Sequence, residues 1–168
     1  MKSKMAQFAL IVSGITFNPI AYSAVTWQMD GGSNCSDVTV CYGNTRTYSA
    51  SSGATTVTAS AWSNTSGTGN SVLENAYLGV YSGSGLGVTN RDGANGTDAS
   101  EGTRPEHAMD NDQRVDSILF SFSSAVSLTG VKIGWYSADS DITILDYTVA
   151  GAPTMCGNSY DSLRPSGE

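Results

Sequence analysis

Apolar and polar side chains alternate in a stretch of the second half of the sequence, and a period of two is typical of a half-buried β-strand. The apolar side chains of one parity are Ile118, Phe120 and Phe122, whereas Ser117 and Ser121 have the other parity. We therefore expect a strand here, with its phenylalanines facing the core.

A second alternating stretch follows, in which Val131, Ile133 and Trp135 share one parity and Lys132 and Gly134 have the other. The connection between the two stretches is short, which favours antiparallel pairing of neighbouring strands. We expect the apolar side chains of both stretches to face one shared core, with Trp135 inside it.

A third stretch, residues 142–148, has apolar residues of both parities, as in a strand that is covered on both faces. Further strands are expected at residues 25–29, 38–42, 45–50, 55–62 and 74–81. Within the fourth of these, Val57, Ala59 and Ala61 share a face, and its threonines and small residues favour a position near a sheet edge.

The fold class follows from the absence of any long segment with the 3.6-residue apolar period of a helix. Glycine, serine and threonine are abundant, so the sequence predicts an all-β fold, an antiparallel β-sandwich of jelly-roll type. Residues 24–168 suit a single domain. Residues 153–168 are polar and show no terminating strand or helix, so we expect this domain to be truncated at its C-terminal end.

Residues 1–23 have the pattern of a secretory signal peptide. Two lysines near the start precede a mostly apolar run at residues 6–17, and Ala21 and Ser23 are small residues at the positions that a signal peptidase reads. We expect cleavage before Ala24, plus or minus one residue. The alternative is an uncleaved membrane anchor, but the apolar run is short for a span and is followed by an Asn-Pro pair.

The charge balance narrows the classes of partner. Without the two lysines of the leader, six basic side chains (eight less two) stand against 15 acidic ones, a net charge of −9. Nucleic acids and anionic lipid headgroups require the opposite balance. We therefore expect no nucleic-acid partner and no binding to anionic lipid headgroups, whereas the leader predicts an exported protein with no direct membrane span in the mature chain.

Three cysteines are compatible with an oxidising compartment. Cys35 and Cys41 are close in sequence, and a disulfide between them would stabilise the fold by roughly 2–3 kcal/mol in the chain-entropy model. Cys156 is left over, and it either pairs with one of the other two cysteines or has lost its partner. The spacing of Cys35 and Cys41 does not fit a CxxC metal or redox site.

Acidic and amide side chains occur in two predicted loops that antiparallel strands would bring to one end of the sheet. Calcium prefers six to eight oxygen ligands, so calcium is the one cofactor that this pattern suggests. The candidate ligands are Glu106, Asp110, Asn111, Asp116, Asp139 and Asp141. The alternative is that these side chains cap turns and solvate loops. The spacing is not that of an EF-hand.

Enzymatic chemistry has little support. His107 is the only histidine, which excludes multi-histidine metal sites, and no Gly-x-Ser-x-Gly elbow accompanies it. Glu106 with Asp116 or Asp139 could form a glycosidase pair, but the sequence does not give the distance between them. We expect no enzymatic activity and keep a hydrolase as the less favoured alternative.

Aromatic side chains with a polar edge suggest a sugar-binding face. The candidates are Trp62, Tyr77, Tyr81, Trp135 and Tyr136, of which Tyr136 is expected to be the more exposed. The glycine-rich stretch at residues 82–88 lacks the Lys-Ser/Thr pair and the helix of a phosphate loop, so its glycines are expected to permit a bend.

Four stretches together, residues 76–88, 106–111, 131–135 and 139–143, resemble the exosortase-dependent surface protein family, exported proteins of Gram-negative bacteria with a PEP-CTERM sorting tail. The resemblance implies a non-enzymatic protein of the cell surface or extracellular matrix. The Val-Pro-Glu-Pro signature, the tail helix and the terminal arginines are missing, so an exosortase is an expected partner only if a sorting tail follows downstream. The alternative function is a carbohydrate-binding module, calcium-dependent if the acidic loops bind the ion, with extracellular polysaccharide as its partner.

Overall fold

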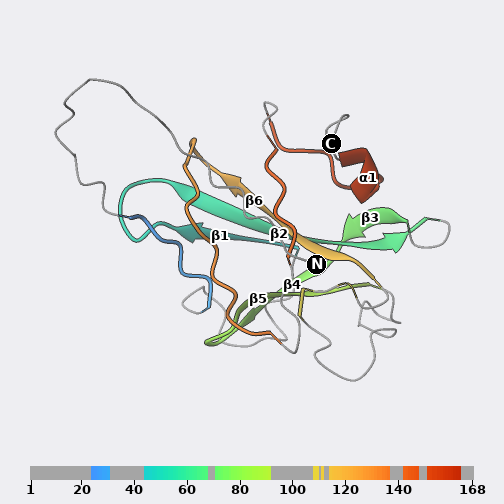
Figure 1. Ribbon diagram of the computed structural model, residues 1–168, viewed down its shortest axis with the longest axis horizontal. Helices are drawn as coiled ribbons and strands as arrows, with labels where there is room; N and C mark the ends of the chain where they lie inside the picture. Colours follow the sequence, from blue (N-terminus) through green and yellow to red (C-terminus); the bar gives the residue numbers. More distant parts are fainter. Residues whose placement is uncertain are drawn as a thin grey trace, which may run out of the picture.

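The computed structural model describes residues 24–30, 44–67, 71–91, 108–109, 111, 114–136, 142–147 and 151–163. Its elements are β1 (Thr45–Ser49), β2 (Thr56–Ser66), β3 (Val72–Asn75), β4 (Tyr77–Tyr81), β5 (Gly85–Thr89), β6 (Asp116–Phe122) and α1 (Tyr160–Leu163). All strand pairs are antiparallel. The prediction of an all-β fold is confirmed in the described part of the chain (Figure 1).

The long strand β2 is the centre of a four-stranded sheet. Along one edge it pairs with β6, and along the other it pairs first with β1 and then with β3 (Figure 1). The expectation that this stretch lies near a sheet edge is wrong. Its small inward side chains, Ala59 and Ala61, suit a central strand here because they let a second layer approach closely.

Asn44 closes the gap on the edge of β2 where β1 gives way to β3. Its side-chain amide donates to the carbonyl oxygens of Ala61 and, at 3.3 Å, of Ala76. The Ala61 N–H donates to the Asn44 carbonyl at 2.9 Å, and the Ala76 N–H donates to the Ala61 carbonyl at 3.0 Å. Asn44 therefore bonds backbone groups both of β2 and of Ala76, the residue that links β3 to β4.

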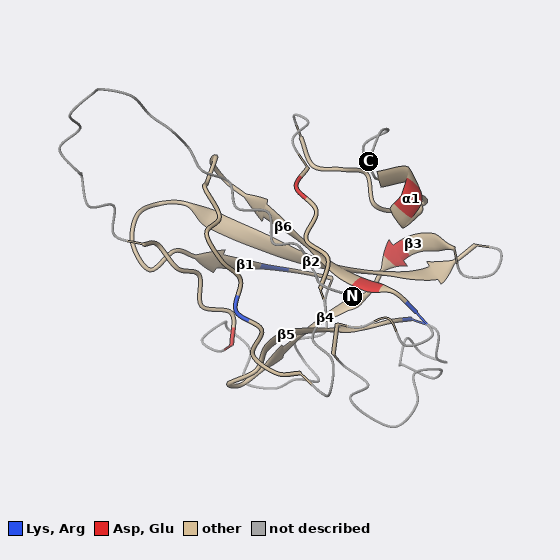
Figure 2. Cartoon of the chain, in the orientation of Figure 1, with Lys and Arg blue, Asp and Glu red and all other residues tan. Residues whose placement is uncertain are grey.

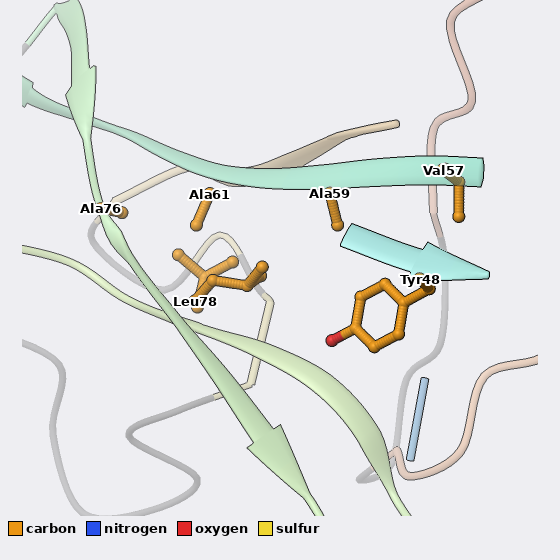
Figure 3. Close-up of a cluster of buried hydrophobic side chains, with 7 residues drawn as sticks. Tyr48, Val57, Ala59, Ala61, Ala76 and Leu78 are labelled. Carbon is orange, nitrogen blue, oxygen red and sulfur yellow. The ribbon is translucent and has the colours of Figure 1, made fainter. Parts of the chain in front are cut away.

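The second layer is the β4–β5 hairpin, which carries no Lys, Arg, Asp or Glu (Figure 2). Its inward side chains, Leu78 and Val88, are fully buried against the inward face of β2. Figure 3 shows that the side chains of Val57, Ala59 and Ala61 project from β2 to one side, on which Tyr48 and Leu78 lie. The shared face predicted for these three β2 residues is confirmed.

The phenylalanines of β6 follow the predicted parity. Ile118, Phe120 and Phe122 are partly buried and pack against the core, opposite Ala61, Ala59 and Val57 respectively. The first alternating stretch is therefore a strand, as its pattern predicted.

The second alternating stretch, residues 131–135, is not a strand, and neither is the described part of the third stretch, residues 142–147. Residues 125–136 and 142–147 are extended without strand pairing, and Val131, Ile133 and Trp135 are 50%, 40% and 48% exposed. The expectation that these three side chains share a core with β6 is wrong. The β4–β5 hairpin already covers that inward face, and Trp27 and Met29 pack against the same core.

The segment at residues 24–30 packs at one side of the two sheets, although it forms no strand. The Thr26 carbonyl accepts a bond of 2.8 Å from the Ser51 N–H, and the Trp27 indole donates to the Thr55 carbonyl at 3.1 Å. The Trp27 ring meets Phe122 edge to face, with ring centroids 5.2 Å apart. The segment thus joins the β1–β2 turn to β6. The strand expected at residues 38–42 lies outside the described residues.

The C-terminal segment at residues 151–163 adds to the free edge of β3. The Leu73 N–H donates to the Asn158 carbonyl at 2.8 Å, and the Gly157 N–H donates to the Leu73 carbonyl at 3.0 Å. Met155 is buried, and α1 follows it (Figure 1). The expectation that residues 153–168 contain no helix is wrong, since α1 lies within them. The backbone bonds to Leu73 of β3 hold this polar segment in place.

Candidate functional site

Of the two candidate metal ligands that the structure describes, Asn111 and Asp116, the buried one is Asp116, at the start of β6. Asp116 is 8% exposed and lies directly opposite Ser63 of β2, which is fully buried. Residues directly opposite in an antiparallel pair project from the same face of a sheet. Asp116 and Ser63 thus continue the inward face of Ala61 toward one end of the core.

A hydrogen-bond network fixes the residue just before Asp116. The Val115 N–H donates to Asn64 Oδ1 at 2.8 Å, and the Asn64 N–H donates to the Val115 carbonyl at 3.3 Å. The hydroxyl of Tyr160 in α1 bonds both that carbonyl and Ser117 Oγ, at 2.9 Å each. The C-terminal helix therefore helps to set the position of the first residues of β6.

The phenol of Tyr160 stays neutral over the ordinary pH range. Burial raises its pKa to about 12, the negative charge of Asp116 acts in the same direction, and the hydrogen bond to Ser117 lowers it. A phenol with so high a pKa donates a hydrogen bond and does not act as a base at neutral pH. The role of Tyr160 at the start of β6 is therefore structural.

The predicted calcium ligands are described only in part. Asn111 is exposed and Asp116 is buried, and no hydrogen bond joins them. Glu106, Asp110, Asp139 and Asp141 lie outside the described residues. Within the described ranges, no group of three or more His, Cys, Asp or Glu side chains is placed to hold a metal ion. The calcium site stays a prediction.

Most of the other residues predicted to have a catalytic or disulfide role also lie outside the described part of the chain. His107 lies outside the described residues, so neither the hydrolase arrangement nor the glycosidase pair is tested. Cys35 and Cys41 also lie outside them, whereas Cys156 is exposed and has a free thiol. The Cys35–Cys41 disulfide stays a prediction.

Three of the five aromatic candidates are engaged by the fold. The Trp62 indole donates to Ser60 Oγ at 2.9 Å on the outer face of β2. The guanidinium of Arg91 lies 5.3 Å from the centre of the Tyr77 ring. The Tyr81 ring covers Gly79, where a Cβ atom would lie 2.6 Å from the ring. These three side chains stabilise the sheets through their contacts, so they are less suited to bind a sugar.

The remaining two aromatic candidates are at the surface. Tyr136 is 65% exposed, as expected. Trp135 is 48% exposed, so its expected place in the core is wrong. Both follow Gly134, which passes close to the turn between β4 and β5: a Cβ atom on Gly134 would lie 2.1 Å from the Ser84 carbonyl oxygen.

That turn confirms the role expected of its glycines. The Ser84 N–H donates to the Tyr81 carbonyl at 2.9 Å, and Gly83 has a φ of 75°. A positive φ favours glycine because it carries no Cβ atom. The stretch therefore forms the tip of a hairpin and not a phosphate loop.

Two structural residues were missed by sequence reasoning. Trp27 shares its parity with Val25 and Met29, and that alternation was a usable signal for a core-facing ring. Tyr160 had no such signal, because it follows a polar segment and its partners, Val115 and Ser117, are distant in sequence.

None of the residues that the structure describes belongs to a helix long and apolar enough to cross a bilayer. Comparisons with protein-family models, with curated proteins and with solved structures found no match.

Proposed function

We propose that this chain is an exported, non-enzymatic protein of the cell surface or extracellular matrix, whose two layers belong to a β-sandwich of jelly-roll type. The pattern of a secretory leader at residues 1–23 and the excess of acidic side chains support export. The resemblance to exosortase-dependent surface proteins supports the same location.

The observation that carries the proposal is the exposure of large apolar side chains on two extended segments. They are Leu128, Val131, Ile133, Trp135 and Tyr136 in the first, and Ile142, Ile144, Leu145 and Tyr147 in the second. Soluble domains rarely expose contiguous apolar patches unless these bind something. Such surfaces are suited to adhesion or assembly, which are the tasks of a matrix component.

Export is tested on the full chain with a C-terminal tag in a Gram-negative host. We expect a product that begins at residue 24, plus or minus one, and that is recovered outside the cells, in the culture medium or bound to matrix. The matched control is Leu10→Asp, which interrupts the apolar run of the leader and should leave the product unprocessed inside the cell. A wild-type product that keeps its leader and stays in the cytoplasm would overturn the proposal.

An exosortase enters the proposal as a partner only through a sorting tail. The coding sequence downstream of Glu168 decides this point, since a PEP-CTERM tail there would make the chain an exosortase substrate. Without such a tail, we expect the processed protein in the culture medium or bound to matrix, and not attached to the outer surface.

A carbohydrate-binding module is the second candidate function. The observation that favours it is the exposure of adjacent Trp135 and Tyr136 side chains. Aromatic rings with a polar edge present both an apolar face and a hydrogen-bonding group, which suits sugar rings. Retention of the mature protein on polysaccharide would support this binding function. A mature protein that is not retained would have a purely structural function.

A further inference from the structure

We propose that the tip of the β4–β5 hairpin and the aromatic pair beside it bind a neutral polysaccharide. The hairpin-tip site consists of Ser82, Gly83, Ser84, Gly134, Trp135 and Tyr136. This inference deepens the second candidate function and rests on it, because it names both the residues and the chemical class of the ligand.

The aromatic pair is anchored to the hairpin, although residues 131–136 form no strand. The backbone at Gly134 lies so close to the Ser84 carbonyl that a Cβ atom there would be 2.1 Å away. Figure 1 shows this segment running beside the hairpin. The turn itself is held by the Ser84–Tyr81 bond of 2.9 Å and by the Gly83 N–H, which donates to the Asp30 carbonyl at 3.3 Å. The segment that carries the aromatic pair thus meets the turn of the hairpin through the backbone at Gly134.

The groups at this tip are those that recognise sugars. Trp135 and Tyr136 are 48% and 65% exposed, and Ser82 and Gly83 are exposed in the turn that the Gly134 backbone approaches. Aromatic faces pack against the C–H faces of pyranose rings, whereas serine hydroxyls and backbone groups hydrogen-bond sugar hydroxyls. A purely apolar ligand would not form hydrogen bonds with these groups.

Charge selects a neutral ligand. No residue of the hairpin-tip site is charged at neutral pH, and β4 and β5 contain no charged side chain (Figure 2). The chain as a whole has a net charge of −7, so an anionic polysaccharide would be repelled. A second copy of the chain carries the same negative charge and is disfavoured for the same reason.

Binding is tested with the mature protein and three matrices: cellulose and starch as neutral polysaccharides, and alginate as an anionic one. We expect retention on a neutral matrix and none on alginate. Tyr136→Ala and Trp135→Ala should each weaken retention about tenfold, since each removes one stacking ring. Tyr147→Ala removes an exposed tyrosine outside the site and should retain wild-type binding.

Gly134→Ala tests the anchor separately. The added methyl group must displace the segment from Ser84, so binding should fall while the circular dichroism spectrum and the main unfolding transition stay as in the wild type. The inference is overturned if no neutral matrix retains the protein, if Tyr147→Ala is as damaging as Tyr136→Ala, or if Trp135→Ala instead disrupts a dimer. A protein that is exported but not retained would overturn this inference alone.

Discussion

At the scale of single residues, the most informative is Tyr48. Its ring lies in the core between the two layers (Figure 3), and its hydroxyl is buried with no hydrogen-bond partner in the described chain. Burial raises the pKa of this phenol, and the positive charge of Arg46 only partly opposes the effect. A buried hydroxyl without a partner carries a desolvation cost that the ring does not.

We therefore expect Tyr48→Phe to keep or raise the free energy of unfolding, by up to about 1 kcal/mol. Tyr48→Ala, in which the ring itself is lost, should cost about 3–5 kcal/mol because a cavity remains. Urea denaturation of the three proteins measures both effects. A loss of more than about 1 kcal/mol in Tyr48→Phe would show that the hydroxyl has a stabilising partner.

Tyr160 makes a prediction about alkaline pH. Its pKa is about 12 in the folded protein against 10.0 for an ordinary phenol, so the unfolded chain loses this proton first as pH rises. The unfolded state then binds fewer protons, and the free energy of unfolding falls with pH. The stabilising contribution is complete below pH 10 and is lost as pH rises to about 12.

Melting temperatures measured from pH 8 to pH 12 test this point. Tyr160→Phe should be less stable than the wild type at pH 8, because it lacks both hydrogen bonds of the hydroxyl. The difference should shrink above pH 10, where only the wild type has this phenol to ionise. Tyr147→Phe, at an exposed position, should run parallel to the wild type throughout.

At the scale of elements, alternation predicted which side chains share a face, but not what covers that face. The pattern identified β1, the inward face of β2 and the parity of β6 correctly. For residues 131–135 it failed, because the hairpin layer occupies the core that these side chains were expected to enter. The buried Asp116 and the anchor at Gly134 depend on neighbours far along the sequence, which periodicity does not reveal.

The small residues of β2 set the distance between the two layers. Ala59 is fully buried, with Tyr48 and Leu78 in the same cluster (Figure 3). Ala59→Leu inserts a larger side chain into this packed layer and should cost about 1–3 kcal/mol. Thr45→Leu adds a leucine at an exposed position of β1, where a change within about 0.5 kcal/mol is expected.

Chemical denaturation compares the two leucine variants directly. Equal stability of Ala59→Leu and Thr45→Leu would show that the layers separate without cost, and that β2 does not hold the hairpin at a fixed distance.

At the scale of the whole molecule, the cysteines report on maturation. Cys156 is exposed with a free thiol, and a Cys35–Cys41 disulfide is predicted from sequence. The exported protein should therefore have one thiol that reacts with a maleimide without unfolding, and Cys156→Ser should have none. Non-reducing peptide mapping that links Cys35 to Cys156, or a native protein with three reactive thiols, would contradict the predicted pairing.

The acidic loops give the last prediction about the molecule as a whole. If Asp110, Asn111, Asp139 and Asp141 meet at one end of the sandwich, their carboxylates repel one another, and a bound cation relieves that repulsion. Calcium that binds only the folded state stabilises it by about 2.7 kcal/mol at a hundredfold excess over Kd, so the melting temperature should rise with the logarithm of calcium concentration. Asp139→Asn with Asp141→Asn should abolish the rise.

The matched control for calcium is Asp146→Asn with Asp161→Asn, which makes the same change of charge at exposed positions outside the two loops. This variant should keep the full calcium response, because general screening of negative charge is then the same in both double variants. If the two variants lose the response equally, calcium acts through net charge alone. If the wild-type melting temperature does not depend on calcium, these carboxylates cap turns and solvate the loops, and the hairpin tip is left as the site through which the molecule would bind a partner.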